Sequence, residues 1–409
     1  MKNIKGLKIT IIGMGYIGLP TGITFARAGF KVVGFDINKN VIETLKLGKI
    51  HIVEPDLQEA YEEALQSGNL KVTAKLEKSD VYIIAVPTPF KKNENKKIAD
   101  LSYVESASKM VAEVLEPGNL VILESTVPPK TTKIMTDILE ENSGLSRDKF
   151  LTCHCPERVL PGKILYELEH NDRIIGAEKK EAGNLAKEIY KEIVKKGEIY
   201  ITDDITAEMA KLVENTYRDV NIAFANELSV ICDKLGINVF ELIKLSNKHP
   251  RVNILTPGAG VGGHCLAVDP WFIVEQFQQE ANVIREARLI NDYKPQWIVD
   301  KVEKELDFNK NKKIGILGLA YKPDIDDLRE SPSMEIALTL KEKDYDIYAC
   351  EPNIISNEIN GIKNLSLENL LNKVDYIVIT LAHKEFIENI DKIKRKSYIF
   401  DCIGLTKKF

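Results

Sequence analysis

One cysteine stands in a setting that suits nucleophilic catalysis. Cys265 ends segment 257–265, which carries four glycines just before it. Such a loop lets backbone N–H groups crowd around a ligand. A cysteine reached by this loop can act as a thiolate and attack an electrophilic carbon. The alternative is a small buried cysteine beside a flexible turn, the commoner setting for an arbitrary cysteine.

A polar stripe lies on a long helical segment upstream of that loop. Lys211, Asn215 and Arg218 are spaced i, i+4 and i+7, so they share one face of a helix. A solvated face is the ordinary explanation of such a stripe. The rest of the segment is strongly apolar, however, which favours a helix packed between two lobes. We expect this stripe to face the cleft that the lobes form.

The N-terminal segment carries a glycine string typical of dinucleotide binding. Gly13, Gly15 and Gly18 follow an apolar run and precede a helical pattern, so backbone N–H groups can approach a pyrophosphate. Asp36 ends the next apolar run, where a carboxylate accepts ribose hydroxyls and repels a 2′-phosphate. The sequence therefore predicts NAD rather than NADP. A glycine-rich turn without a ligand is the alternative.

A short cysteine–histidine motif raises the question of a metal. Cys153, His154 and Cys155 are consecutive, but no second ligand pair with zinc-site spacing follows them. We interpret them as residues at the end of a strand and predict no metal.

The elements that must position these residues alternate between strands and helices at both ends of the chain. This alternation predicts an α/β fold with parallel sheets, built as two Rossmann-like doubly wound modules joined by a long central helix. The central helix is expected over 206–235, about 45 Å long, with Gly236 as its C-terminal cap. The predicted domains are 1–203, 204–309 and 310–409. The strands are expected at 7–12, 31–35, 81–86, 120–123, 148–152, 313–317, 346–350, 376–380 and 397–401.

Composition excludes several classes of protein. The chain has 409 residues and a formal net charge of −5, whereas nucleic-acid and anionic-membrane surfaces need a basic excess. No run approaches the roughly 18 apolar residues of a membrane span. Six cysteines scattered over the chain suit free thiols in a reducing cytoplasm.

These motifs together resemble the UDP-glucose/GDP-mannose dehydrogenase family, and the resemblance covers nearly the whole chain. Three further stretches, 156–162, 249–255 and 264–272, resemble its UDP-N-acetyl-D-mannosamine dehydrogenase branch. UDP-glucose enzymes typically carry Phe-Leu where this chain has Arg158-Val159, and Lys where it has Val268. The shared motifs are the glycine string, Val-Pro-Thr-Pro at 86–89, Glu-Ser-Thr-Val-Pro at 124–128, Pro-Glu-Arg at 156–158, Lys211 with Asn215, Gly-Gly-His-Cys at 262–265 with Asp269, and Tyr-Lys-Pro at 321–323 with Arg-Glu-Ser-Pro at 329–332.

The resemblance implies oxidation of a sugar C6 alcohol to a carboxylate with two NAD, one water and no metal. It implies that Lys211 stabilises the developing alkoxide and, with Asn215, the later oxyanions. Cys265 would capture the aldehyde and pass through a thioester. Glu157 or Asp269 would position the hydrolytic water, and the sequence leaves that choice open. Thr126 resembles the family threonine near the active-site water and the nicotinamide.

The resemblance also implies the binding residues and the partners. The expected partners are a UDP-sugar substrate and a second copy of the chain, in a homodimer or homotetramer, with Arg251 supplied across the dimer interface. The C-terminal loop at 318–322 resembles a uridine nucleotide site, and Arg329 would reach the NAD side unless it forms a surface salt bridge in the acidic run 324–330. The cofactor contacts are expected from Gly13, Gly15, Tyr16, Ile17, Gly18, Asp36, Thr88, Thr126 and Arg329, and the substrate contacts from Arg158, Val159, Lys211, Asn215, Arg218, His249, Arg251, Gly262, Tyr321 and Lys322.

Three alternatives remain open from sequence. The substrate could be UDP-GlcNAc or UDP-glucose. A two-electron dehydrogenase would share the N-terminal module without needing a thiol. A nucleotide-sugar sensor would bind without turnover, although binding alone does not require a nucleophile.

Overall fold

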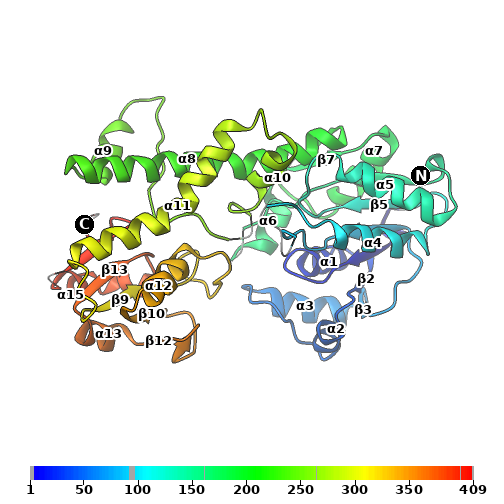
Figure 1. The fold of residues 1–409 in the computed structure, drawn as a ribbon. Coiled ribbons are helices and arrows are strands. Elements are labelled where there is room, and N and C mark those ends of the chain that lie inside the picture. The colour runs from blue at the N-terminus through cyan, green and yellow to red at the C-terminus, as the bar shows by residue number, and fades with distance from the viewer. Residues whose placement is uncertain (1–3, 92–96, 161, 264, 397, 408–409) are drawn as a thin grey trace. The chain divides into compact units, whose positions relative to one another are not determined.

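The computed structural model describes residues 4–91, 97–160, 162–263, 265–396 and 398–407, and it divides into two compact units (Figure 1). The first unit is Met1–Val213 and the second is Glu214–Phe409. His264 of the cysteine motif, Pro161 of the 156–162 stretch and Ser397 of the last expected strand lie outside the described residues.

A doubly wound sheet forms the centre of the first unit. Its strand order is β3-β2-β1-β4-β5-β6-β7-β8, and the first six positions follow the 3-2-1-4-5-6 order of dinucleotide-binding folds. Residues of β4 and β5 are buried throughout, as expected for parallel strands covered on both faces. The strands are β1 (Lys8–Ile12), β2 (Lys31–Phe35), β3 (Leu70–Thr73), β4 (Val81–Ile84), β5 (Leu120–Leu123), β6 (Leu151–His154), β7 (Arg173–Gly176) and β8 (Ile199–Thr202).

Helices bury both faces of this sheet. Leu19, Ile23 and Tyr190 belong to one apolar cluster, whereas Val104 and Met135 belong to another, so side chains alternate between two cores. The helices are α1 (Gly18–Arg27), α2 (Lys39–Lys46), α3 (Leu57–Gln66), α4 (Ser102–Ala112), α5 (Thr131–Ser143), α6 (Ile164–His170) and α7 (Lys180–Lys191).

The first sheet differs from the sequence prediction in several details. Strands β3, β7 and β8 have no counterpart among the predicted strands, and the strand predicted at 81–86 ends at Ile84. The strand expected at 148–152 is instead β6 (Leu151–His154), because the charged residues Arg147–Lys149 form a surface 3-10 turn and burial begins at Phe150. In addition, β6 pairs with β7 in antiparallel fashion at His154 and Gly176, so the sheet is not wholly parallel.

The long central helix is α8 (Asp204–Leu235), followed by Gly236 at φ +68°, as the sequence predicts. Its apolar positions do not all lie in a core. Leu212 is buried, but Val213 is 49%, Phe224 50% and Ile231 46% exposed. Within the second unit α8 lies beside α11 (Asn282–Glu305), and Asn226 donates to Asn291 at 2.9 Å (Figure 1).

The second unit contains another Rossmann-like sheet, with strand order β11-β12-β10-β9-β13-β14. The predicted α/β fold, with two such modules and a long central helix, is confirmed. In the described ranges no helix is both long and apolar enough to cross a membrane. The strands are β9 (Lys313–Leu317), β10 (Asp346–Cys350), β11 (Glu358–Ile359), β12 (Ile362–Asn364), β13 (Tyr376–Ile379) and β14 (Ile399–Asp401), and the remaining helices are α9 (Val239–Ser246), α10 (Asp269–Gln276), α12 (Pro332–Glu342), α13 (Leu367–Lys373), α14 (Lys384–Glu388) and α15 (Ile390–Lys394).

Candidate active site

The glycine string has the close contacts that a pyrophosphate loop requires. Gly13 has φ +94°, and a Cβ added there would lie 2.6 Å from the Ala85 carbonyl oxygen. A Cβ on Gly18 would lie 1.9 Å from the Gly13 carbonyl oxygen, so α1 could not begin where it does. A Cβ on Gly15 would meet nothing within 4 Å. The loop is therefore closely packed on the protein side and open where a phosphate would approach.

Asp36 follows β2 and holds this loop. Its Oδ2 accepts the Met14 N–H at 2.8 Å and its Oδ1 accepts the Asn38 N–H at 2.8 Å. The side chain is only half-buried. Each carboxylate oxygen retains a lone pair, so Asp36 can still accept ribose hydroxyls. These residues fit NAD, and their roles as cofactor contacts stay predictions, as do those of Tyr16 and Ile17.

We expect Asp36→Asn to raise the KM for NAD about tenfold or more, because a hydrogen bond to a charged acceptor is replaced by one to a neutral amide. The same change removes the repulsion of a 2′-phosphate, so kcat/KM with NADP should rise relative to NAD. Steady-state kinetics with both cofactors measures this ratio. Glu43→Gln, at an exposed position of α2, is the charge-matched control and should leave the ratio unchanged. An unchanged ratio in Asp36→Asn would contradict the assignment.

Hydrogen bonds join the loop that follows β4 to the loop that follows β5, at the carboxyl ends of these strands. Thr88 Oγ1 donates to the Thr126 carbonyl at 2.7 Å, and Ser125 Oγ donates to the Val86 carbonyl at 2.7 Å. Glu208 of α8 fixes the next stretch, since its Oε1 accepts the N–H and the hydroxyl of Thr132 at the start of α5. The structure therefore brings Thr88 and Thr126 together.

Glu157 lies in a buried ionic cluster that the sequence did not reveal. Its Oε2 is 2.6 Å from Nη2 of Arg173 in β7, and its Oε1 accepts the Arg158 N–H at 2.7 Å. Glu124, directly after β5, lies 3.5 Å from Nη1 of the same arginine and accepts from Tyr190 at 3.2 Å. Burial raises the pKa of Glu124 to about 7, with Arg173 opposing the rise and the charge of Glu157 adding to it.

The cysteine–histidine motif is a strand end, as interpreted. Cys153, His154 and Cys155 are buried at and just after the end of β6. Burial raises the pKa of Cys155 to about 12 and lowers that of His154 to about 3. Among the described residues no group of three or more His, Cys, Asp or Glu side chains is arranged to hold a metal.

In the second unit a side-chain hydrogen bond joins Asn215 to Asp269, and a backbone hydrogen bond joins Asp269 to Cys265. Asn215 Nδ2 donates to Asp269 Oδ2 at 2.6 Å, and both residues are buried. The Asp269 N–H donates to the Cys265 carbonyl at 2.9 Å, in the turn that leads into α10. Cys265 itself is exposed, unlike the other five cysteines. An accessible thiol thus stands one helical turn before a buried carboxylate.

The glycines before Cys265 allow close packing against the C-terminal module. A Cβ on Gly262 would lie 2.3 Å from the Glu330 carbonyl oxygen, and one on Gly263 would lie 2.8 Å from the Tyr321 ring. Gly263 also has φ +84°. Tyr321 therefore packs against the cysteine loop, a contact that explains these two glycines.

The other predicted residues are distributed over both units. Lys211 is half-buried on α8 in the first unit, four residues before Asn215. Arg158 donates to the Asp172 carbonyl at 3.1 Å, and Arg329 pairs with Asp327 at 2.6 Å, the salt-bridge alternative weighed above. Their functional roles stay predictions, as do those of half-buried Val159 and of the exposed side chains Arg218, His249, Arg251 and Lys322.

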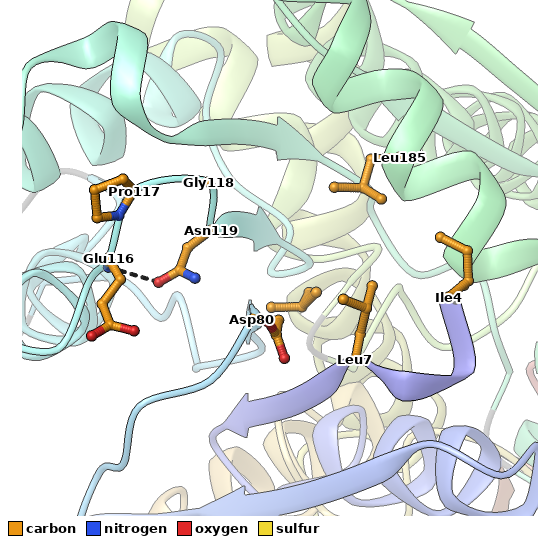
Figure 2. Close-up of a pocket in the computed structure, with 9 residues that line it drawn as sticks. Ile4, Leu7, Asp80, Glu116, Pro117, Gly118, Asn119 and Leu185 are labelled. Carbon is orange, nitrogen blue, oxygen red and sulfur yellow. Dashed lines mark hydrogen bonds between the residues drawn. The ribbon is translucent and has the colours of Figure 1, made fainter. Parts of the chain in front are cut away.

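The first unit has a cavity of about 150 Å³, which does not lie at the carboxyl ends of the strands (Figure 2). Leu7, Asp80 and Asn119 line it, and each directly precedes a strand. It therefore lies at the amino ends of β1, β4 and β5, whereas open α/β sheets bind ligands at the carboxyl ends. We assign it no part in the site.

Comparison with known proteins identifies the three parts of this chain. Residues 7–194 match the NAD binding domain of the UDP-glucose/GDP-mannose dehydrogenase family, residues 205–293 its central domain and residues 315–408 its UDP binding domain. The predicted NAD cofactor is thus confirmed.

Relatives and solved structures of similar length give the same result. A UDP-N-acetyl-D-mannosamine dehydrogenase of Campylobacter jejuni is 51% identical, covering 93% of this chain and 96% of that protein. An NDP-N-acetyl-D-galactosaminuronic acid dehydrogenase of Ralstonia nicotianae is 46% identical, covering 92% and 91%. The structure of a UDP-D-ManNAc dehydrogenase from Pyrococcus horikoshii is 41% identical with a TM-score of 0.90, covering 98% and 97%. This chain belongs to the UDP-glucose/GDP-mannose dehydrogenase family, whose members are NAD-dependent oxidoreductases.

Proposed function

We propose that this protein is a UDP-N-acetyl-D-mannosamine 6-dehydrogenase that oxidises the C6 alcohol to the uronate: UDP-ManNAc, two NAD and water give UDP-ManNAcA and two NADH. The observation that supports this proposal is the exposed Cys265, whose carbonyl accepts the N–H of Asp269, the residue that pairs with buried Asn215. The 51% identity to the C. jejuni enzyme supports the choice of sugar.

The chemistry divides between an alcohol oxidation and a thiol-mediated oxidation. NAD, when bound, accepts one hydride in each. Lys211 stabilises the alkoxide that develops at C6 in the first. The Cys265 thiolate then adds to the aldehyde, and Asn215 donates to the oxyanion of the thiohemiacetal. Loss of the second hydride leaves a thioester, and water cleaves it to the carboxylate and the free thiol.

We infer that Asp269, rather than Glu157, positions the hydrolytic water. Asp269 is joined to Cys265 through one backbone hydrogen bond and faces Asn215. Glu157 already has both oxygens engaged, one by Arg173 and one by the Arg158 N–H. Through these two contacts Glu157 fixes the loop that carries Arg158.

A substrate panel tests the proposed function. We expect two NADH per sugar consumed with UDP-ManNAc, and a kcat/KM at least about tenfold above that for UDP-GlcNAc or UDP-glucose, a difference of about 1.4 kcal/mol in transition-state binding. Absorbance of NADH together with mass spectrometry of the sugar product gives both numbers. One NADH per sugar would favour the two-electron alternative, and no NAD reduction with any UDP-sugar would favour a sensor.

The substrate panel should also include UDP-N-acetyl-galactosamine. The R. nicotianae relative, named for an N-acetyl-D-galactosaminuronic acid, is nearly as similar as the mannosamine enzymes. Of the candidate contacts to the sugar, the guanidinium groups of Arg158 and Arg251 suit an acetamido oxygen, but they do not distinguish these two sugars, which differ in configuration at C2 and C4. UDP-N-acetyl-galactosamine is therefore the decisive competitor, and a higher kcat/KM with it would replace the proposed substrate.

We also propose a homodimer or homotetramer built on α8. Tyr217, Phe224 and Ile231 repeat every seven residues along this helix and are 67%, 50% and 46% exposed. An apolar stripe with this spacing is typical of a helix that packs on another helix. Arg251 would then be contributed by the partner.

A charge placed in that stripe tests the assembly. We expect Phe224→Asp to shift the protein to monomer in sedimentation velocity, because burying an unpaired carboxylate in an apolar interface is strongly unfavourable. Val283→Asp is the matched control, since Val283 of α11 is 70% exposed and outside the stripe. A monomeric wild-type protein at working concentration would contradict the proposal.

Two further assignments stay proposals of the same kind. Six free cysteines and the NAD chemistry support a cytoplasmic enzyme. The division into domains 1–203, 204–309 and 310–409 is supported by the polar stretch between α11 and β9, and limited proteolysis at that stretch would test its second boundary.

A further inference from the structure

The C-terminal module has its own loop after its first strand, and this loop carries Tyr321 and Lys322. Gly318 follows β9 with φ +94°, the same value as Gly13 after β1. A Cβ on Gly318 would lie 2.6 Å from the Leu381 side chain. The two modules therefore start their nucleotide loops in the same way, and they differ in what happens next.

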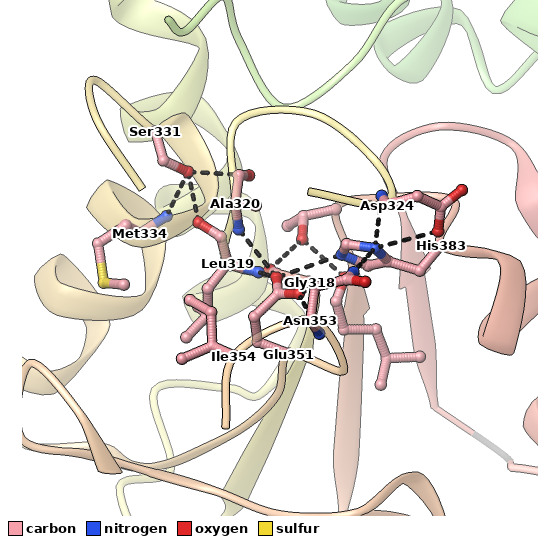
Figure 3. A network of polar contacts seen from close by, with 12 residues as sticks. Gly318, Leu319, Ala320, Asp324, Ser331, Met334, Glu351, Asn353, Ile354 and His383 are labelled. Carbon is pink, nitrogen blue, oxygen red and sulfur yellow. Dashed lines mark hydrogen bonds and ion pairs between the residues drawn. The ribbon is translucent and has the colours of Figure 1, made fainter. Parts of the chain in front are cut away.

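The acid that follows the second strand is used differently in the two modules. Asp36 follows β2 and is half-exposed, whereas Glu351 follows β10 and is 1% exposed. Glu351 Oε2 accepts the Leu319 N–H at 2.8 Å and the Ala320 N–H at 3.0 Å (Figure 3). Its Oε1 accepts the Asn353 N–H at 3.2 Å. Glu351 is thus turned into the protein and is not available to a ribose.

His383, which is fully buried, joins Glu351 to the far end of the same loop. Its Nδ1 accepts the Asp324 N–H at 2.9 Å, so this nitrogen carries no proton. The proton therefore lies on Nε2, which donates to Glu351 Oε2 at 3.2 Å. The Asp324 carboxylate is 3.6 Å from Nδ1 and accepts instead from the Lys384 N–H at 2.9 Å. The neutral Nε2–H tautomer satisfies both contacts.

A third contact holds the loop from the side of α12. Ser331 Oγ lies 2.6 Å from the Leu319 carbonyl and 3.0 Å from the Ala320 carbonyl, and it accepts the Met334 N–H at the start of α12 (Figure 3). Burial alone would raise the pKa of Glu351, but the contacts from His383 and the two loop N–H groups outweigh it and hold that pKa below the ordinary value. The buried acceptor of the loop is therefore a carboxylate at neutral pH.

We propose that Glu351 and His383 are positioning residues for the UDP-sugar: they fix loop 319–324 at both ends, so that Tyr321 and Lys322 between those ends are held ready for the nucleotide diphosphate. The inference rests on the proposed function, in which this module takes the uridine nucleotide. It also explains why the second module does not offer a dinucleotide site, since the acid that would hold a ribose is engaged within the protein.

Two conservative substitutions of His383 test separately the contacts at the two ends of loop 319–324. His383→Asn keeps an acceptor near Asp324 but loses the donor to Glu351, and His383→Gln keeps a donor near Glu351 but loses the acceptor. The full-length protein is titrated with UDP by calorimetry and assayed for KM and kcat. We expect both variants to weaken UDP binding and raise the UDP-sugar KM about tenfold, with the NAD KM unchanged and kcat at saturation within about threefold.

Hydrogen exchange keeps the test independent of folding. The amides of Leu319, Ala320 and Asp324 should be protected in the wild type, and the Asp324 amide should lose protection in His383→Gln while amides of β9 keep theirs. Wild-type UDP affinity in both folded variants would overturn the inference. Its failure is distinct from failure of the proposed function, because UDP binding requires no turnover: wild-type affinity in the two folded variants overturns the inference alone, whereas a wild-type protein that does not bind UDP would refute the function itself.

Discussion

Cys265→Ser is expected to form no uronate, with net turnover reduced at least about 10³-fold, because a serine hydroxyl at neutral pH is a far weaker nucleophile than a thiolate. Neither the aldehyde capture nor the thioester can then form at useful rates. Mass spectrometry of the sugar product, with NADH counted in parallel, measures both oxidation steps. A residual single oxidation that stops at the aldehyde would agree with this expectation.

A second thiol provides the control for that experiment. Cys232 lies in the same unit, is buried in an apolar cluster, and has its pKa raised by burial. Cys232→Ser should therefore retain turnover, apart from any loss of stability. Because Cys265 is exposed, its substitution should leave the unfolding curve unchanged. Normal acid formation by folded Cys265→Ser would refute the covalent route.

Arg173→Met is expected to destabilise the first unit by about 3–5 kcal/mol, because it leaves buried Glu157, and Glu124 in its ionised form, without a countercharge. The arginine is 3% exposed and is shared by both carboxylates. Denaturant unfolding followed by circular dichroism should show an earlier first transition. The triple variant with Glu124→Gln and Glu157→Gln removes the unpaired charges and should recover most of the loss. No recovery would mean that packing of the guanidinium, not charge, is what matters.

Glu124 also gives this cluster a pH dependence of known sign. Its pKa is about 7 in the folded protein against an ordinary value of 4.5, so the folded state binds the proton more tightly. The contribution of Glu124 to the free energy of unfolding is fully present below about pH 4.5. It is lost as the pH rises through 7, and the loss is about 3 kcal/mol at most. Glu124→Gln should flatten the stability profile between pH 5 and 8. A profile as steep as that of the wild type would place the titrating group elsewhere.

The sequence predicts the parts of the site whose signals are local. The glycine string and Asp36 are recognisable because strand, tight turn and acid follow one another within about 25 residues, as the βαβ unit requires. Asn215 and Asp269 are 54 residues apart, and only the family resemblance suggested that they work together. The structure adds that they are hydrogen-bonded.

The Arg173 cluster shows why other parts could not be predicted. Glu124, Glu157 and Arg173 come from three different strand ends, and neither their spacing nor their types distinguish them from surface charges. The antiparallel pairing of β6 with β7 carries Arg173 to this position, and no periodicity in the sequence indicates a reversal of strand direction. The same limit applies to Tyr321, whose ring explains Gly262 and Gly263 only once the fold is known.

The distribution of thiols has a practical consequence. Five cysteines are buried, with pKa values raised by that burial, while the sixth is exposed on the glycine loop. An alkylating reagent such as iodoacetamide therefore meets one accessible sulfur per chain, and modification should reach one equivalent as inactivation completes. Peroxide would oxidise the same atom first. Covalent probes and inhibitors that react with thiols should therefore modify Cys265 before any other cysteine.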